Sequence, residues 1–119
     1  MMTLDEIEKK YHWSEWRPFP RPDQKDYLCA PYRFGVYQIR NSKTNQYIMF
    51  GEGGHLAHRM SSILPEPHGI RGRKNEKKRQ HVWTHLASIE YRTVPCLSKS
   101  EALQIQQELK SLGIHLFNT

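Results

Sequence analysis

The stretch over residues 35–60 constrains the fold of this chain most, because it holds two strand patterns joined by a short polar loop. Residues 35–39 and 46–50 are rich in β-branched and aromatic side chains, which favour half-buried strands. Residues 41–45 (Asn-Ser-Lys-Thr-Asn) have a loop composition, and so short a connection predicts an antiparallel hairpin. Residues 51–54 (Gly-Glu-Gly-Gly) predict a turn, and apolar residues at helical spacing then predict a helix over 55–64.

Local patterns on both sides of this hairpin predict the other elements. A Thr-Leu-Asp-Glu capping box predicts a short helix over residues 3–11, and a Ser-Lys-Ser-Glu box predicts a helix over about 99–112. Gly113 is placed to cap that second helix. Alternating apolar and polar residues predict a third strand over 86–94, after a helix over 76–86. We therefore expect an α+β fold: a small three-stranded antiparallel or mixed sheet flanked by helices.

The segment over residues 11–32 differs in composition from the rest of the chain. Its four prolines exclude a continuous helix or a central strand. We expect an extended arm whose aromatic side chains pack over the sheet, although exposed aromatics of this kind would also suit base stacking. The chain thus divides into a helix and arm over residues 1–34 and a domain over residues 35–119. The aromatics of the arm are Tyr11, Trp13, Trp16, Phe19, Tyr27 and Tyr32.

Length and charge limit the classes of protein to consider. A chain of 119 residues is long enough for one domain and too short for two ordinary ones. The formal net charge of +6 favours a polyanionic partner, nucleic acid above all. We find no signal-peptide pattern and no apolar run of the roughly 20 residues that a membrane span needs. We therefore expect a cytoplasmic, intracellular protein with no membrane partner, in which Cys29 and Cys96 stay reduced.

Several different short motifs follow one another along the chain. They are Gly35-Val36-Tyr37 on the first strand, Met49-Phe50-Gly51 on the second, Leu56 and Arg59 on the following helix, and Glu101-Ala102 and Phe117-Asn118 near the end. In order and spacing these motifs resemble those of the GIY-YIG nucleases, and the resemblance covers about residues 33–118. The family carries Gly-Ile-Tyr and Tyr-Ile-Gly on its two strands, an arginine on the helix and a metal-binding glutamate on the last helix.

The resemblance implies metal-dependent hydrolysis of phosphodiester bonds. Tyr37 would activate the attacking water or relay its proton, and Arg59 would contact the scissile phosphate. A carboxylate on the last helix would hold one divalent cation, Mg²⁺ or a similar ion, and Asn118 would support that end of the site. His55, beside the glycine-rich turn, would carry a proton.

Two positions depart from the family pattern. The fourth residue after Ala102 is Gln106 instead of glutamate, and a neutral amide is a poor ligand for a hard cation. Met49 stands in place of the second tyrosine, with Tyr47 two residues earlier and expected on the same strand face. We therefore expect nucleic-acid binding with little or no cleavage. Either the protein is a natural non-cleaving member, or a carboxylate has been replaced. The alternative is a non-catalytic module that binds nucleic acid, or that binds a protein partner through residues 11–32.

A dense basic cluster follows the motif-bearing helix, and Lys and Arg side chains of this kind contact phosphates without reading sequence. We expect this cluster to bind nucleic acid, double-stranded DNA in particular; a solvated helix face is the alternative. His55 and His58 are three residues apart, and we interpret them as surface histidines and not as metal ligands. The basic cluster comprises Arg71, Arg73, Lys74, Lys77, Lys78 and Arg79.

Overall fold

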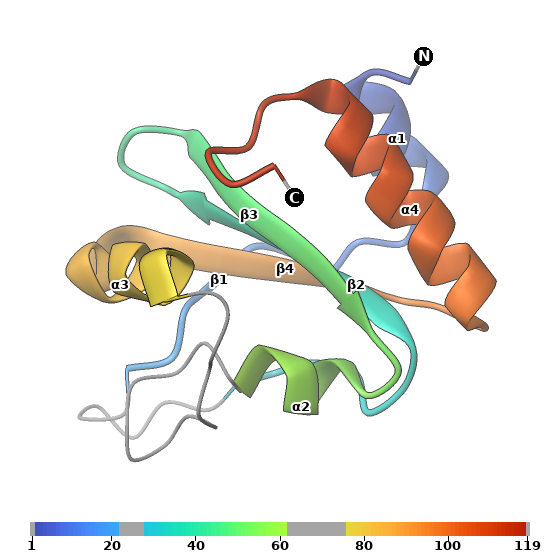
Figure 1. Ribbon diagram of the computed structural model, residues 1–119, viewed down its shortest axis with the longest axis horizontal. Helices are drawn as coiled ribbons and strands as arrows, with labels where there is room; N and C mark the ends of the chain where they lie inside the picture. The colour runs from blue at the N-terminus through green and yellow to red at the C-terminus, as the bar shows by residue number, and fades with distance from the viewer. Residues whose placement is uncertain (1, 22–27, 62–75, 119) are drawn as a thin grey trace.

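The computed structural model describes residues 2–21, 28–61 and 76–118, which form an antiparallel sheet with helices on both faces (Figure 1). The strands are β1 (Arg17–Pro18), β2 (Gly35–Asn41), β3 (Gln46–Gly53) and β4 (Ile89–Pro95), in the spatial order β1-β4-β2-β3. The expected α+β class is confirmed. The expectation of three strands is wrong: the described part of the chain has four, because the arm contributes the short strand β1 at the edge of β4.

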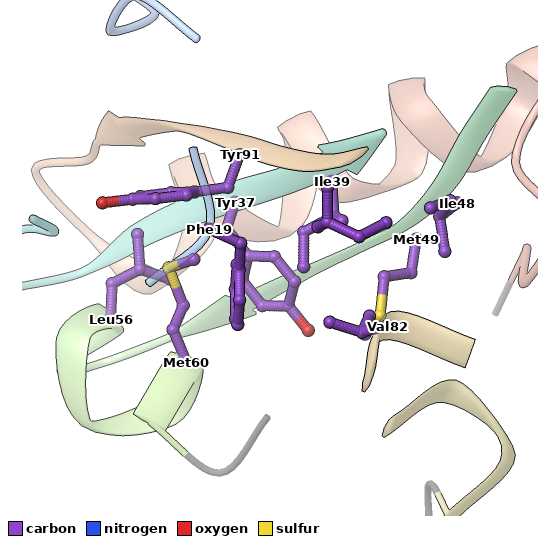
Figure 2. Packing of buried hydrophobic residues seen from close by; sticks show 10 residues of the cluster. Phe19, Tyr37, Ile39, Ile48, Met49, Leu56, Met60, Val82 and Tyr91 are labelled. Atoms are coloured by element: carbon purple, nitrogen blue, oxygen red, sulfur yellow. The ribbon is translucent and has the colours of Figure 1, made fainter. Parts of the chain in front are cut away.

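The helices form two layers. α1 (Leu4–Lys10) and α4 (Lys99–Leu112) lie on one face of the sheet, and α2 (Leu56–Ser61) and α3 (Glu76–Thr84) lie on the other (Figure 1). In the described residues, no helix combines the length and the apolar character that crossing a membrane requires. The core under α1 and α4 contains Ile7, Val36, Phe50, Val94, Cys96, Ala102, Ile105 and Leu109. The core under α2 and α3 contains Phe19, Tyr37, Ile39, Ile48, Met49, Leu56, Met60, Val82, Ile89 and Tyr91 (Figure 2).

Several predicted boundaries differ from those observed. β3 continues to Gly53, so the expected turn at residues 51–54 begins later. β4 begins at Ile89 because residues 86–88 form the 3-10 helix η2 (Leu86–Ser88). The helix expected over residues 55–64 is α2 as far as Ser61, and residues 62–64 lie outside the described part of the chain.

The helix caps follow the predicted chemistry. The Thr3 side chain accepts a hydrogen bond from the backbone N–H of Glu6, whose carboxylate accepts one from the Thr3 backbone N–H, which completes a capping box. The Ser98 hydroxyl accepts from the Glu101 backbone N–H at the start of α4. Gly113 ends α4 with a φ of 64°, a backbone angle that favours glycine.

A β-bulge in β3 changes the face on which Tyr47 lies. Ile39 pairs with Met49 but Arg40 pairs with Tyr47, so Ile48 is the extra residue of the bulge. Ile48 and Met49 both join the core under α2 and α3. Tyr47 consequently shares the opposite face with Arg40, and the expectation that it lies on the same face as Met49 is wrong.

The two ends of the chain cover the two edges of the sheet. In the arm, the backbone N–H of Ser14 donates to the Thr93 carbonyl at 2.8 Å, and that of Phe19 donates to the Ile89 carbonyl at 2.9 Å. At the other edge, residues 116 and 117 donate to the carbonyls of Tyr47 and Ile48 at 3.0 and 2.8 Å. The segment that contains residues 116 and 117 thus runs beside β3.

Aromatic side chains of the arm pack within the fold. Phe19 is buried in the core under α2 and α3. Trp13 and Trp16 each hold the Arg92 guanidinium 4.5 Å from their ring centres. These three residues therefore act as a strap, as expected, and not as an open stacking platform; Tyr32 remains 80% exposed and Tyr27 lies outside the described residues.

Candidate functional site

Tyr37 lies at the centre of the α2 and α3 face, on β2. Its ring is packed among core side chains and is only 4% exposed (Figure 2). Burial raises the pKa of Tyr37 to about 12, although the positive charge of Arg59 acts in the opposite direction. The hydroxyl therefore keeps its proton at neutral pH, which makes it a hydrogen-bond donor.

Two glycines of β3 seat the two motif residues. A β-carbon at Gly51 would lie 2.7 Å from the Tyr37 ring and hydroxyl, and one at Gly53 would lie 3.0 Å from the β-carbon of Arg59. Gly51 and Gly53 are two residues apart in one strand, so they open the same face of the sheet. The glycines thus let the Tyr37 ring and the Arg59 stem lie directly against the strand backbone.

A second cation from α3 lies near this pair. Lys78 is half-buried, and its pKa is lowered first by burial and then by the positive charge of Arg59. Tyr37, Arg59 and Lys78 thus come from three different elements, and Arg59 is coupled electrostatically to each of the other two. Cations gathered beside a neutral hydroxyl suit an anionic oxygen, such as one of a phosphate.

The predicted basic cluster divides where it enters α3. Lys77 is exposed, but Arg79 is only 6% exposed and its guanidinium lies 4.6 Å from the centre of the Trp83 ring. Arg79 therefore packs against its own helix and serves the fold. The remaining members, Arg71, Arg73 and Lys74, lie outside the described residues.

The other residues implied by the resemblance lie elsewhere. Gln106 is half-buried on α4, which packs on the face of the sheet opposite the Tyr37 ring. The Asn118 amide donates to the Lys110 carbonyl near the end of α4 at 3.0 Å. Tyr47 packs against Trp16 and His115. The exposed His55 accepts a hydrogen bond through Nδ1 from the His58 backbone N–H at 3.1 Å, so it caps α2.

A hard divalent cation does not fit the residues around Tyr37. Mg²⁺ prefers carboxylate oxygens, and the described residues contain no group of three or more His, Cys, Asp or Glu able to hold a metal. Gln106 offers only an amide, on the other face. Glu52 pairs with Val36, whose side chain points to the α1 and α4 core, so Glu52 also faces away from Tyr37.

A buried polar network on the opposite face is absent from the sequence-based expectations. Arg92 donates through Nε to the Gln38 side-chain oxygen at 2.8 Å and through a terminal nitrogen to Glu8 at 3.2 Å. The Gln38 amide nitrogen then donates to His115 Nε2 at 3.0 Å, which fixes Nε2 as the unprotonated nitrogen. Burial, with a smaller effect of Arg92, lowers the pKa of His115 to about 4. A polar Gln38 between the apolar neighbours Tyr37 and Ile39 was a sequence signal of this network.

Comparisons of the chain with family models, with curated proteins and with solved structures give no match. The likeness to the GIY-YIG nucleases therefore stays a prediction from the sequence motifs.

Proposed function

We propose that this chain binds the phosphate backbone of nucleic acid, with double-stranded DNA as its ligand, through a GIY-YIG-type domain that cleaves the backbone slowly or not at all. The observation that supports this proposal best is the pairing of Tyr37 with Arg59 over Gly51 and Gly53. Three of these four positions, Tyr37, Gly51 and Arg59, fall within the motifs that resemble the nuclease family.

Phosphate binding is the chemistry that these residues support. Arg59 is exposed, and a guanidinium presents its N–H groups in a planar fork that matches a phosphate. Lys78 adds a second cation beside it, and Lys77 adds an exposed one on α3. A net charge of +6 draws the chain toward a polyanion over a longer range.

Rapid hydrolysis is not supported by the same residues. An efficient general base needs a pKa near the working pH, whereas the pKa of Tyr37 is about 12. The surroundings of Tyr37 also lack, among the described residues, a ligand set for Mg²⁺. Loss of one electrostatic stabiliser of a developing charge costs about 100- to 1000-fold in rate, so weak or absent cleavage is expected.

The arm offers less support for the alternative of a protein-binding module. In the described part of the arm, Phe19 is buried in the core, and Trp13 and Trp16 pack on Arg92. These side chains serve the fold, which leaves them little apolar surface for a partner.

The test is the salt dependence of binding to fluorescent duplex DNA of several sequences. Arg59→Ala and Lys77→Ala should each weaken binding similarly for every sequence, and each should reduce the salt slope by about one. Lys9→Ala is the matched control, because Lys9 is exposed on α1 at the other face. Arg79→Ala is avoided because Arg79 is buried against Trp83. Unchanged affinity in both test variants would overturn the proposal.

A further inference from the structure

Two histidines lie one helical turn apart at the end of α3. His81 and His85 are four residues apart, and residues with this spacing are neighbours on a helix surface. Their ring centres are 4.6 Å apart, with an angle of 48° between the ring planes. The backbone N–H of His85 donates to the His81 carbonyl at 3.2 Å, which continues the helical spacing to His85.

The separation of the rings matches the geometry of a shared metal ion. An imidazole nitrogen binds Zn²⁺ at about 2.0–2.1 Å, so two rings on one ion have their centres roughly 4.5–5.2 Å apart at bond angles between square and tetrahedral. The observed 4.6 Å falls inside this range. The centre of the Phe117 ring lies 5.9 Å from that of the His81 ring, with an angle of 76° between the ring planes, and this contact restricts the rotation of His81 and so prepares it for binding.

A second neighbouring histidine pair in the described part of the chain lacks these properties. The ring centres of His55 and His58 are 6.0 Å apart. The Nδ1 atom of His55 already accepts a hydrogen bond from the His58 backbone. This second pair therefore serves as an internal control.

We propose that His81 and His85 together chelate one transition-metal ion of the zinc, nickel or copper class. Neutral imidazole suits these ions, and copper should bind more tightly than nickel or zinc. Two protein ligands leave further coordination positions open to water or to an oxygen ligand, unlike the closed set of a structural zinc site. Hard Mg²⁺ is excluded, because it prefers oxygen ligands. This site is independent of the proposed function, since neither histidine belongs to the Tyr37 and Arg59 pair.

The test is isothermal titration of the tag-free chain with ZnCl₂, NiCl₂ and CuCl₂, each in a non-chelating buffer. The wild-type chain should bind one ion with the order of affinity given above, and MgCl₂ should give no binding heat. His81→Ala and His85→Ala should each weaken binding by at least about 10-fold, the lower end of the loss that even an outer-shell change causes. His58→Ala should bind like the wild-type chain.

Thermal unfolding provides a second readout that does not depend on any activity. A ligand that binds only the folded chain raises the unfolding temperature with its concentration. The wild-type chain and His58→Ala should show this rise with Zn²⁺, and His85→Ala should not. His85 is exposed, so its variant should fold even if His81→Ala does not. Unchanged affinity in His85→Ala, loss of binding in His58→Ala, or absence of binding in the wild-type chain would each overturn the proposal.

Discussion

At the residue scale, the lack of a side chain at Gly51 leaves space for the buried Tyr37 ring, which lies where a β-carbon would be. A methyl group there would lie 2.7 Å from the ring and hydroxyl. Overpacking of a well-packed core costs about 1–3 kcal/mol, so Gly51→Ala should lower the free energy of unfolding by that amount in urea denaturation. Gly54→Ala is the matched control: its nearest neighbour, the Phe34 ring, is 3.4 Å away, an ordinary contact. Equal stability of the two variants would contradict this packing.

The burial of Tyr37 also predicts a loss of stability in alkali. The unfolded chain releases the phenolic proton near pH 10 and the folded chain near pH 12. Between these values the folded state binds more protons, so the free energy of unfolding falls as the pH rises. Tyr37→Phe removes the contribution of the phenol. The free energy of unfolding of this variant should therefore fall less steeply with pH, by about 1.4 kcal/mol per pH unit. The measurement is urea denaturation of both chains between pH 9 and 11.5. Parallel curves would contradict the raised pKa.

At the scale of single elements, the Ser98 hydroxyl caps the start of α4. Ser98 accepts from the Glu101 backbone N–H, and loss of such a cap costs about 1 kcal/mol. Ser98→Ala should lower the free energy of unfolding by this amount, measured by chemical denaturation. Ser100 is also exposed and lies inside the first turn, so Ser100→Ala should leave stability unchanged or slightly higher. The reverse order of the two variants would place the cap elsewhere.

The elements also show which parts of the fold could be predicted from sequence. Thr3, Ser98 and Gly113 act through backbone groups a few residues away, so their roles are readable from local sequence. The bulge at Ile48 depends on the register between two strands, and no residue type near it predicts that β3 holds an extra residue. The strand β1 exists only because the arm meets β4, a contact that is distant in sequence.

The candidate site was predictable to a similar extent. Tyr37 and Arg59 come together because the hairpin and the helix after it are neighbours in the chain. The face occupied by Gln106 depends on how α4 packs after β4, which the motif spacing does not reveal. The burial of Arg79 likewise depends on Trp83, whereas its sequence context suggested only a charged cluster.

At the scale of the whole molecule, the sheet separates the Tyr37 face from the α4 face. A carboxylate at position 106 would therefore lie on the wrong side of the sheet to hold a cation for a phosphate beside Arg59. Gln106→Glu should leave the Mg²⁺-dependent cleavage of plasmid DNA unchanged, at the level of the buffer control. Gln107→Glu, at an exposed position of the same helix, controls for the added charge. Strong cleavage by Gln106→Glu alone would show that position 106 reaches the phosphate.

The pairing of the arm with β4 has a consequence for the order of folding. Arg17 lies beside Tyr91, so this contact forms only after the whole of the intervening chain has been synthesised. The β2–β3 hairpin, in contrast, joins neighbouring residues and forms early. Before the arm pairs with β4, the backbone groups that it later covers are open to other chains, and such edges promote association between molecules. Refolding at high concentration should therefore yield more aggregate when Phe19, the buried anchor of the arm, is replaced by serine.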